Sequence, residues 1–254
     1  MIKKLINYKE KNMLNKKKNI YALITARKGS KGIKDKNLKK IKKKTLVEIT
    51  IDKVKKIKKI DKIFCSSDDK RIEKICRINK INFIERPKNL ALDNSSSFSV
   101  VRHFANYLKK RKISMPFVVL LLQSTSPFLK KSSIIKVINS YNKYYQANSI
   151  NTFIDVEHKY YMQNFAKIKN NKVSYLNRKL REKSKPRQKI DKFFVHGNLH
   201  SFKLNQALKK ENLFPKPTYS VILENRFESI DIDDEYSLFL SRLLVSKSKK
   251  NILS

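Results

Sequence analysis

The sequence predicts an α/β fold in which helices cover both faces of a mostly parallel sheet. Short apolar runs, typical of strands, alternate with longer stretches typical of helices from residue 20 to residue 154. Polar turns follow three of these apolar runs, at the carboxyl ends where an open α/β sheet binds its ligands. The length of 254 residues is enough for one hydrophobic core and a smaller appendage. Strands that alternate with helices in this way build a parallel sheet.

The expected elements follow one another in a regular order. The first strand, near 20–26, ends at the first polar turn, and the strand near 117–122 is the longest apolar run of the chain. The other strands are expected near 61–66, 81–85 and 149–154, and the helices near 45–58, 68–79, 95–111, 130–144 and 234–245.

Two segments do not fit this alternation. Residues 156–195 are polar, rich in Tyr at first and then basic over 178–192, so they form either an arm inserted in the core or a disordered basic insertion. Residues 1–18 carry seven lysines without periodicity and are expected to be a disordered basic extension, with Met13 as an alternative start. The predicted core therefore comprises 19–155 and 196–247.

The formal net charge of +39 would ordinarily indicate a nucleic-acid-binding protein. The lysines are spread along the whole chain, however, and no nucleic-acid-binding module is recognisable. Many Asn and Ile, three Gly and no Trp indicate a genome biased against G and C instead. The apolar run at 117–122 is too short to cross a bilayer, and no secretory signal is visible, so a cytoplasmic protein is expected. Cys65 and Cys76 are interpreted as small buried hydrophobic residues.

Two of the three glycines, Gly29 and Gly32, lie in the turn after the first strand. In a chain so poor in glycine, they indicate a backbone that needs positive φ or the close approach of a ligand. Successive backbone N–H groups in such a turn form a concave anion site, to which Arg27 and Lys31 add two cations. The spacing matches neither the Walker loop nor the dinucleotide fingerprint. The sequence therefore predicts a phosphate-binding loop of another kind.

Four further blocks follow this turn along the chain: Arg-Pro-x-x-Leu-Ala-x-Asp-x-Ser-Ser-Ser at 86–97, Leu-Leu-Gln-Ser-Thr-Ser-Pro at 121–127, Arg187-Gln188 ahead of Gly197, and Ser-Ile-Asp-Ile-Asp at 229–233. Together with the turn at 26–32 and Asn37, they resemble in order the blocks of the CMP-N-acylneuraminate synthetase (acylneuraminate cytidylyltransferase) family. Thr25, Lys28 and Ser124 depart from the family pattern.

The resemblance implies a fold, an activity and partners. The fold would be the Rossmann-like sheet of the nucleotide-diphospho-sugar transferase type, with 156–195 as a small dimerisation arm of a homodimer. The activity would be that of a cytidylyltransferase that activates a nonulosonic acid with CTP, giving the CMP-sugar and pyrophosphate for cell-surface glycan synthesis. Phosphoryl-type transfer relies on positioning and charge neutralisation, so the site should hold cations, backbone donors and Mg²⁺.

The resemblance also assigns residues to these roles. The nucleotide would be bound by Arg27, Gly29, Ser30, Lys31, Asn37, Arg86 and Ser97. The sugar would be bound by Gln123, Arg187, Gln188, Gly197 and His200. Mg²⁺ would be held by Asp231 and Asp233, which with Arg27 and Lys31 would support catalysis. Two alternatives remain open: Ser97 as a cap of the following helix, and Asp233 as the N-cap of the last helix.

The sugar-binding region departs from the family pattern. Phe194, Val195 and His196 precede Gly197 where the family often has Arg-Pro-Asn, and His200 takes the position of a tyrosine. N-acetylneuraminic, legionaminic, pseudaminic or another nonulosonic acid therefore stays open as the substrate. The alternatives to this function are another sugar nucleotidyltransferase of the KDO type, and an inactive, basic, nucleic-acid-binding relative.

Overall fold

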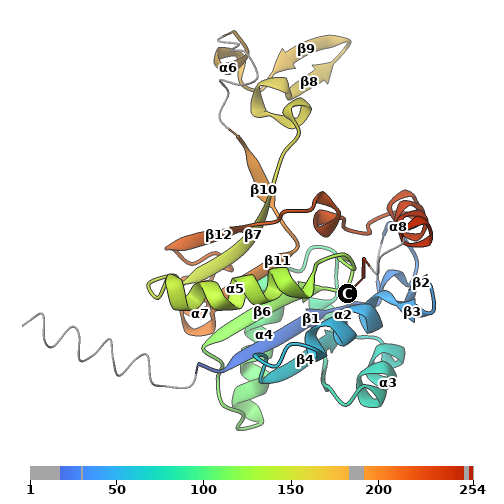
Figure 1. Cartoon of the computed structure of the whole chain (residues 1–254), viewed down its shortest axis with the longest axis vertical. Helices are drawn as coiled ribbons and strands as arrows, with labels where there is room; N and C mark the ends of the chain where they lie inside the picture. The colour runs from blue at the N-terminus through green and yellow to red at the C-terminus, as the bar shows by residue number, and fades with distance from the viewer. Residues whose placement is uncertain (1–17, 30, 183–191, 249–251, 254) are drawn as a thin grey trace, which may run out of the picture.

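The computed structural model describes residues 18–29, 31–182, 192–248 and 252–253, and its centre is an eight-stranded sheet (Figure 1). The strands follow the order β10 (Phe194–His196), β7 (Ser149–Asp155), β11 (Leu199–Lys203), β6 (Val118–Gln123), β1 (Ile20–Thr25), β4 (Lys62–Ser67) and β5 (Asn82–Glu85), with β12 (Thr218–Ile222) also paired to β7. The pairs β1–β4, β1–β6, β4–β5 and β7–β12 are parallel, whereas β10 and β11 are antiparallel to their neighbours. The predicted α/β fold is confirmed.

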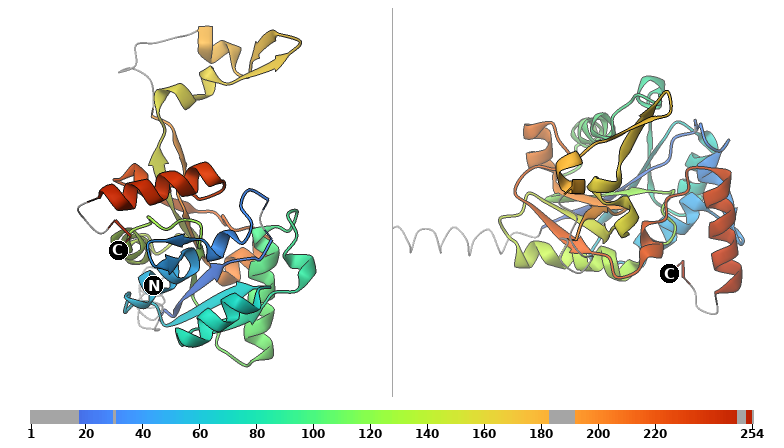
Figure 2. Two further views of the ribbon diagram at one scale, coloured as in Figure 1. Left: turned by 90° about the vertical axis from the view of Figure 1, so that its right-hand side faces the viewer. Right: turned by 90° about the horizontal axis from the view of Figure 1, so that it is seen from above.

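Helices cover both faces of this sheet (Figures 1 and 2). One face packs against α2 (Leu46–Lys55), α3 (Lys70–Ile78) and α5 (Lys131–Lys143), and the other against α4 (Ser97–Lys110) and α7 (Leu204–Lys210). The last helix, α8 (Glu235–Lys247), contacts the hairpin of β2 (Lys40–Ile41) and β3 (Lys44–Thr45). The start of α2 is fixed by a capping box of Thr45 and Glu48, which satisfies backbone donors of the first turn. Within the described ranges, no helix is both long and apolar enough to span a membrane.

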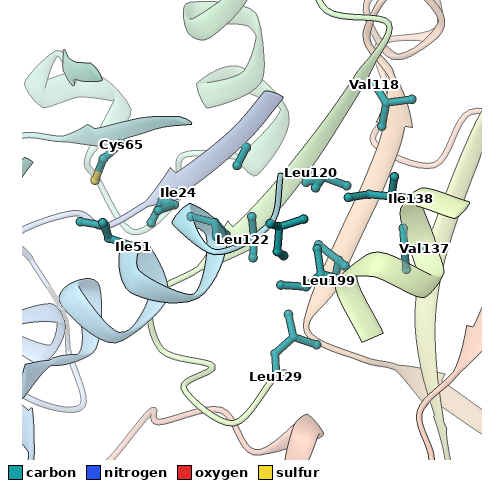
Figure 3. Close-up of a cluster of buried hydrophobic side chains, with 14 of the residues drawn as sticks. Ile24, Ile51, Cys65, Val118, Leu120, Leu122, Leu129, Val137, Ile138 and Leu199 are labelled. Atoms are coloured by element: carbon teal, nitrogen blue, oxygen red, sulfur yellow. The ribbon is translucent and has the colours of Figure 1, made fainter. Parts of the chain in front are cut away.

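Successive side chains of a strand point to opposite faces of the sheet. The central strands therefore contribute to two separate hydrophobic cores, one packed against α2, α3 and α5 (the α2/α5 core) and one against α4 and α7 (the α4/α7 core). In β1, Ala22 and Ile24 point into the α2/α5 core, while Tyr21 and Leu23 point into the α4/α7 core. Figure 3 shows the first of these cores, in which side chains of neighbouring strands meet those of two helices, among them Leu120, Leu122, Leu199, Ile51 and Val137. Both faces of the sheet are therefore buried, which explains the continuous apolar runs.

The two cysteines lie in the α2/α5 core, Cys65 on β4 and Cys76 on α3. Both are free and completely buried. A hydrogen bond with Cys76 and burial together hold the pKa of the Cys65 thiol well above its usual range. The interpretation of these residues as small buried hydrophobic side chains is confirmed.

The arm segment leaves the sheet after β7 and returns at β10 (Figure 1). Its described part holds two 3₁₀ turns (His158–Tyr160 and Met162–Asn164), the hairpin of β8 (Ala166–Lys169) and β9 (Lys172–Tyr175), and α6 (Arg178–Glu182). Figure 1 and the left view of Figure 2 show this part standing apart from the sheet and its helices. Residues 1–17, for which a disordered extension is predicted, lie outside the described residues.

Candidate active site

The predicted site residues meet at the carboxyl edge of the parallel strands. Thr25 at the end of β1 pairs with Gln123 at the end of β6, so the loops that follow these strands start side by side. Here a cavity of about 270 Å³ opens between these loops, the start of α4 and the segment before α8. Six residues predicted for the site line it: Arg27, Asn37, Arg86, Ser97, Gln123 and Asp233.

The two predicted phosphate-binding cations converge on one carboxylate. The Arg27 guanidinium lies 2.5 Å from Asp93, and the Lys31 ammonium lies 3.2 Å from the other oxygen of the same group. Arg27 also donates to the carbonyl of Ala91 at 3.1 Å. Hydrogen bonds from Arg27 and then Lys31 lower the pKa of Asp93. A pair of cations held this close suits an anion with several oxygens, such as a phosphate chain. Ser30 lies outside the described residues.

The two glycines of this loop are needed for different reasons. A Cβ added at Gly32 would lie 1.9 Å from the carbonyl oxygen of Asp233, so only glycine lets the loop approach the segment before α8. A Cβ at Gly29 would meet no protein atom within 4 Å. None of the described glycines has a positive φ. Gly32 is thus needed for a close approach, but of the chain's own Asp233 backbone rather than of a ligand, and the expectation of positive φ is wrong for the described glycines.

We expect Gly32→Ala to lower the free energy of unfolding by about 1–3 kcal/mol, because the added methyl group must push the Asp233 backbone aside. Gly29→Ala is the matched control and should leave stability unchanged, since the space around it is open. Urea unfolding of the two variants and the wild type measures both effects. Equal stabilities for all three proteins would contradict the tight approach at Gly32.

Asn37 connects the phosphate loop to the end of β6. Its amide donates to the carbonyl of Arg27 at 2.7 Å, and its oxygen accepts a 2.5 Å hydrogen bond from the Ser124 hydroxyl. Ser124, which departs from the family's proline, thus supplies a donor that proline lacks. Asn37 is buried and lines the cavity, so it fixes the shape of the loop from within.

Arg86 and Ser97 line the opposite side of the cavity. Arg86 is buried and donates to the hydroxyl and carbonyl of Ser66 at 3.1 and 2.8 Å. Burial lowers the pKa of its guanidinium. Ser97 is the first residue of α4, and the cap is Ser96, whose hydroxyl accepts from the Ser99 amide at 3.1 Å. The alternative in which Ser97 caps the helix is therefore wrong, and its side chain is exposed at the cavity.

The two predicted metal ligands flank Ile232, whose amide donates to the carbonyl of Thr125 at 2.9 Å. This bond ties the acidic segment to the loop after β6. The Asp231 carboxylate accepts a long hydrogen bond of 3.5 Å from the Ser126 hydroxyl. Burial raises the pKa of Asp231, and the charge of Asp233 raises it further. The two carboxylates thus share one small region in which a cation would relieve their repulsion.

Asp233 forms an ion pair of 2.7 Å with Lys36, a residue for which the sequence predicts no role. The N-cap of α8 is Asp234, whose carboxylate accepts from the Ser237 amide at 2.7 Å, so the alternative of Asp233 as that cap is wrong. Lys36 lines the cavity with a side chain that is 13% exposed. The chain has 60 Lys and Arg residues, so the sequence held one signal for Lys36, its position next to Asn37.

The residues predicted to bind the sugar are less closely gathered. Gln123 is exposed at the cavity. Gly197 is buried against Thr152, whose hydroxyl would lie 2.5 Å from an added Cβ, so glycine is needed there for packing. His200 is not among the residues that line the cavity; burial lowers its pKa to about 4, and its ring packs on Phe214 with centroids 5.3 Å apart. Two further predicted residues lie outside the described residues: Arg187 and Gln188.

Comparisons with known proteins identify similar sequences and a family. A family model described as cytidylyltransferase matches residues 21–220. An N-acylneuraminate cytidylyltransferase of Streptococcus agalactiae is 28% identical over 83% of this chain and 49% of its own length. A pseudaminic acid cytidylyltransferase of Campylobacter jejuni is 29% identical over 87% of this chain and 94% of its own length.

The chain spans about half or less of the length of the N-acylneuraminate cytidylyltransferases it matches. Among solved structures, that of CMP:2-keto-3-deoxy-manno-octonic acid synthetase complexed with CTP has a TM-score of 0.66 at 12% identity. It covers 90% of this chain and 99% of its own. At this identity the likeness supports the fold alone.

Proposed function

The chain belongs to the cytidylyltransferase family, and on this basis we propose that it activates a nonulosonic acid with CTP, giving a CMP-sugar and pyrophosphate for glycan synthesis. One observation carries the proposal. Arg27 of the phosphate loop and Asp233 of the acidic pair line one cavity at the carboxyl edge of the sheet, and Lys31 pairs with Asp93, which also lines it. This is the arrangement that transfer of a nucleotidyl group needs, because charge must be neutralised at both ends of the reacting phosphate.

In the proposed reaction, the anomeric 2-hydroxyl of the sugar acid attacks the α-phosphorus of CTP. A new oxygen–phosphorus bond forms, the bond to the bridging oxygen breaks, pyrophosphate leaves and the hydroxyl proton is released. Arg27 and Lys31 would bind the triphosphate and stabilise the departing pyrophosphate, and Asp93 keeps both side chains together. Arg86 and Ser97 would border the cytosine and ribose, and Gln123, which both donates and accepts, would bind hydroxyl groups of the sugar.

The donor set fits a magnesium ion. Asp231 and Asp233 offer hard carboxylate oxygens on one short extended segment, which suits a hard cation. Among the described residues no group of three or more acidic, His or Cys side chains is gathered, so phosphate oxygens and water would supply the other ligands. When bound there, Mg²⁺ would neutralise phosphate charge. Lys36 keeps the Asp233 carboxylate oriented toward the cavity.

The proposed substrate is a nonulosonic acid because two similar proteins are named as cytidylyltransferases of N-acylneuraminate and of pseudaminic acid. Purified protein should release pyrophosphate from CTP only when a suitable sugar acid is present. The test uses CTP, Mg²⁺ and a panel of N-acetylneuraminic, legionaminic, pseudaminic and 3-deoxy-manno-octulosonic acids. Turnover with the last acid alone would replace this proposal with a KDO-type activity. We also propose a cytoplasmic location, which cell fractionation followed by detection of the protein in the soluble fraction would test.

We also propose that the arm forms a homodimer. Ile168 and Val173 pair across the β8–β9 hairpin and are 73% and 57% exposed, although both are large and apolar. Four further large apolar side chains of the arm are also exposed: Tyr160, Met162, Phe165 and Leu176. A self-complementary two-fold contact would bury this surface, and such contacts are common in soluble oligomers.

We expect the double variant Ile168→Glu/Val173→Glu to be monomeric, because charges on this face cannot be buried in a dimer. Analytical ultracentrifugation at micromolar concentration measures the mass. The matched control is Lys167→Glu/Ser174→Glu, which places the same residues on the other face of the hairpin. A wild-type protein that sediments as a monomer would contradict the dimer, as would dimers of equal strength in both variants.

A further inference from the structure

A buried lysine lies behind the loop that joins the two halves of the site. Lys53 on α2 is 5% exposed, and its ammonium donates to the carbonyl of Pro127 at 2.7 Å. Over the described residues it forms no ion pair with a carboxylate, and Glu228 is the acid that acts on it electrostatically. Burial lowers the pKa of Lys53 to about 7, against the opposing effect of Glu228.

Pro127 belongs to the loop of residues 124–129, which follows β6. This loop holds three parts of the site in place. The Ser124 hydroxyl donates to Asn37, which in turn donates to Arg27 of the phosphate loop. The Thr125 carbonyl accepts from the Ile232 amide, between the two predicted metal ligands. The Ser126 hydroxyl reaches Asp231. A shift of the 124–129 loop would therefore move the acidic segment relative to the phosphate loop.

The end of this loop is fixed by Glu228, which is 2% exposed. Its carboxylate accepts from the Lys130 amide at 3.0 Å and from the Ser133 hydroxyl at 2.6 Å, at the start of α5. Its backbone carbonyl accepts from the Asn198 amide. The 124–129 loop is thus held by a buried cation on one side and by a buried carboxylate at its end.

Stability alone does not explain Lys53. Taking an ammonium group out of water is costly, and an apolar side chain of similar volume at such a position is often neutral or stabilising. α2 already buries Val47, Ile49, Ile51 and Val54, so another apolar residue would fit its pattern. What an apolar residue could not supply is a donor for the Pro127 carbonyl.

We propose that Lys53 is a positioning residue, which holds the 124–129 loop and through it sets Asp231 against the phosphate loop. The inference rests on the proposed cytidylyltransferase reaction. Lys53 touches no substrate, so its effect should appear in turnover rather than in nucleotide affinity. A misplacement of about 1 Å is enough to lower a rate about 100-fold.

The test compares Lys53→Met with the wild type and with Lys55→Met. Lys55 lies on the same helix and also donates to a carbonyl, that of Asn79 at 2.9 Å, but it is exposed and remote from the cavity. We expect Lys53→Met to lower kcat about 10–100-fold, to raise the Mg²⁺ concentration at half-maximal rate, and to leave the KM for CTP within about twofold. Its melting temperature should equal or exceed that of the wild type. Lys55→Met should match the wild type in every measurement.

Hydrogen exchange gives a readout that does not need turnover. The amides of Ser126, Leu129 and Ile232 bond within or onto the loop, and we expect them to exchange faster in Lys53→Met than in Lys55→Met. If the wild type makes no CMP-sugar, the proposed function fails, yet the exchange comparison still decides the role of Lys53. Unchanged exchange together with unchanged kcat would overturn it, as would a loss of stability without a loss of kcat. Should Lys53→Met not fold, Lys53→Leu, which also lacks an N–H donor for the Pro127 carbonyl, is judged by the same outcomes.

Discussion

Asp233→Asn should remove most of the turnover and leave the fold intact. The change deletes one negative charge and almost no volume, and the Asp233 side chain is 70% exposed, so packing is not disturbed. The substitution removes one of the two carboxylates of the acidic pair and the charge that pairs with Lys36. We expect kcat in saturating CTP, sugar acid and Mg²⁺ to fall by about two to three orders of magnitude, the scale on which a preorganised electrostatic group acts.

Glu235→Gln is the control for this variant. It removes the same charge two residues away, on an exposed side chain whose nearest cation, Lys39, lies 3.9 Å away. It should retain wild-type turnover, and both variants should keep the wild-type circular dichroism spectrum. Near-normal rates for Asp233→Asn in Mg²⁺ would remove Asp233 from the metal site.

The architecture could be predicted well because local pattern and tertiary structure agree there. The run at 117–122 became β6 with a shift of one residue, and the predicted helix at 130–144 became α5, Lys131–Lys143. The central strands, β6 among them, are buried on both faces of the sheet. A strand that is buried on both faces needs apolar residues at successive positions, and this produces a continuous apolar run in the sequence. The scarcity of glycine made Gly32 conspicuous, although the structure gives a different reason for it, the close approach of the Asp233 backbone.

The pairing of the late strands β11 and β12 could not be predicted in this way. β11 lies between β6 and β7 although it follows both in the chain, and β12 pairs with β7 across about 70 residues of sequence. Such pairings depend on contacts between distant segments rather than on local periodicity. The same holds for Lys36 and Lys53: among 60 basic residues, only the fold shows which ammonium groups are withdrawn from water.

Ser97 shows how a local rule can select the wrong member of a cluster. The run at 94–97 is a good N-cap signal, and Ser96 is the residue that takes the cap. This leaves Ser97 with its hydroxyl at the cavity, where the family resemblance places a nucleotide-binding residue. In the same way Asp234 is the cap of α8, which leaves Asp233 for the cavity.

The second large effect is expected at Arg27. Its guanidinium joins the phosphate loop to the opposite loop through Ala91 and Asp93, and it is 31% exposed, so much of its surface is already desolvated. A fixed cation of this kind stabilises charge that develops on a leaving pyrophosphate more than charge in the bound substrate. We therefore expect Arg27→Ala to lower kcat/KM for CTP by about two to three orders of magnitude and to raise the Kd for CTP.

Lys28→Ala is the matched control for Arg27→Ala, because it removes the same charge from the next residue of the loop. The Lys28 side chain is exposed, and its backbone amide, which the substitution keeps, donates to Asp68 at 2.7 Å. In steady-state kinetics and isothermal titration, the kcat/KM and the Kd for CTP should differ between the two variants by at least about tenfold. A mere loss of long-range attraction would affect both variants equally. If both variants lost the same share of kcat/KM and CTP affinity, Arg27 would contribute only to the overall positive charge of the protein. Normal CTP binding and turnover in Arg27→Ala would show that the triphosphate is bound elsewhere.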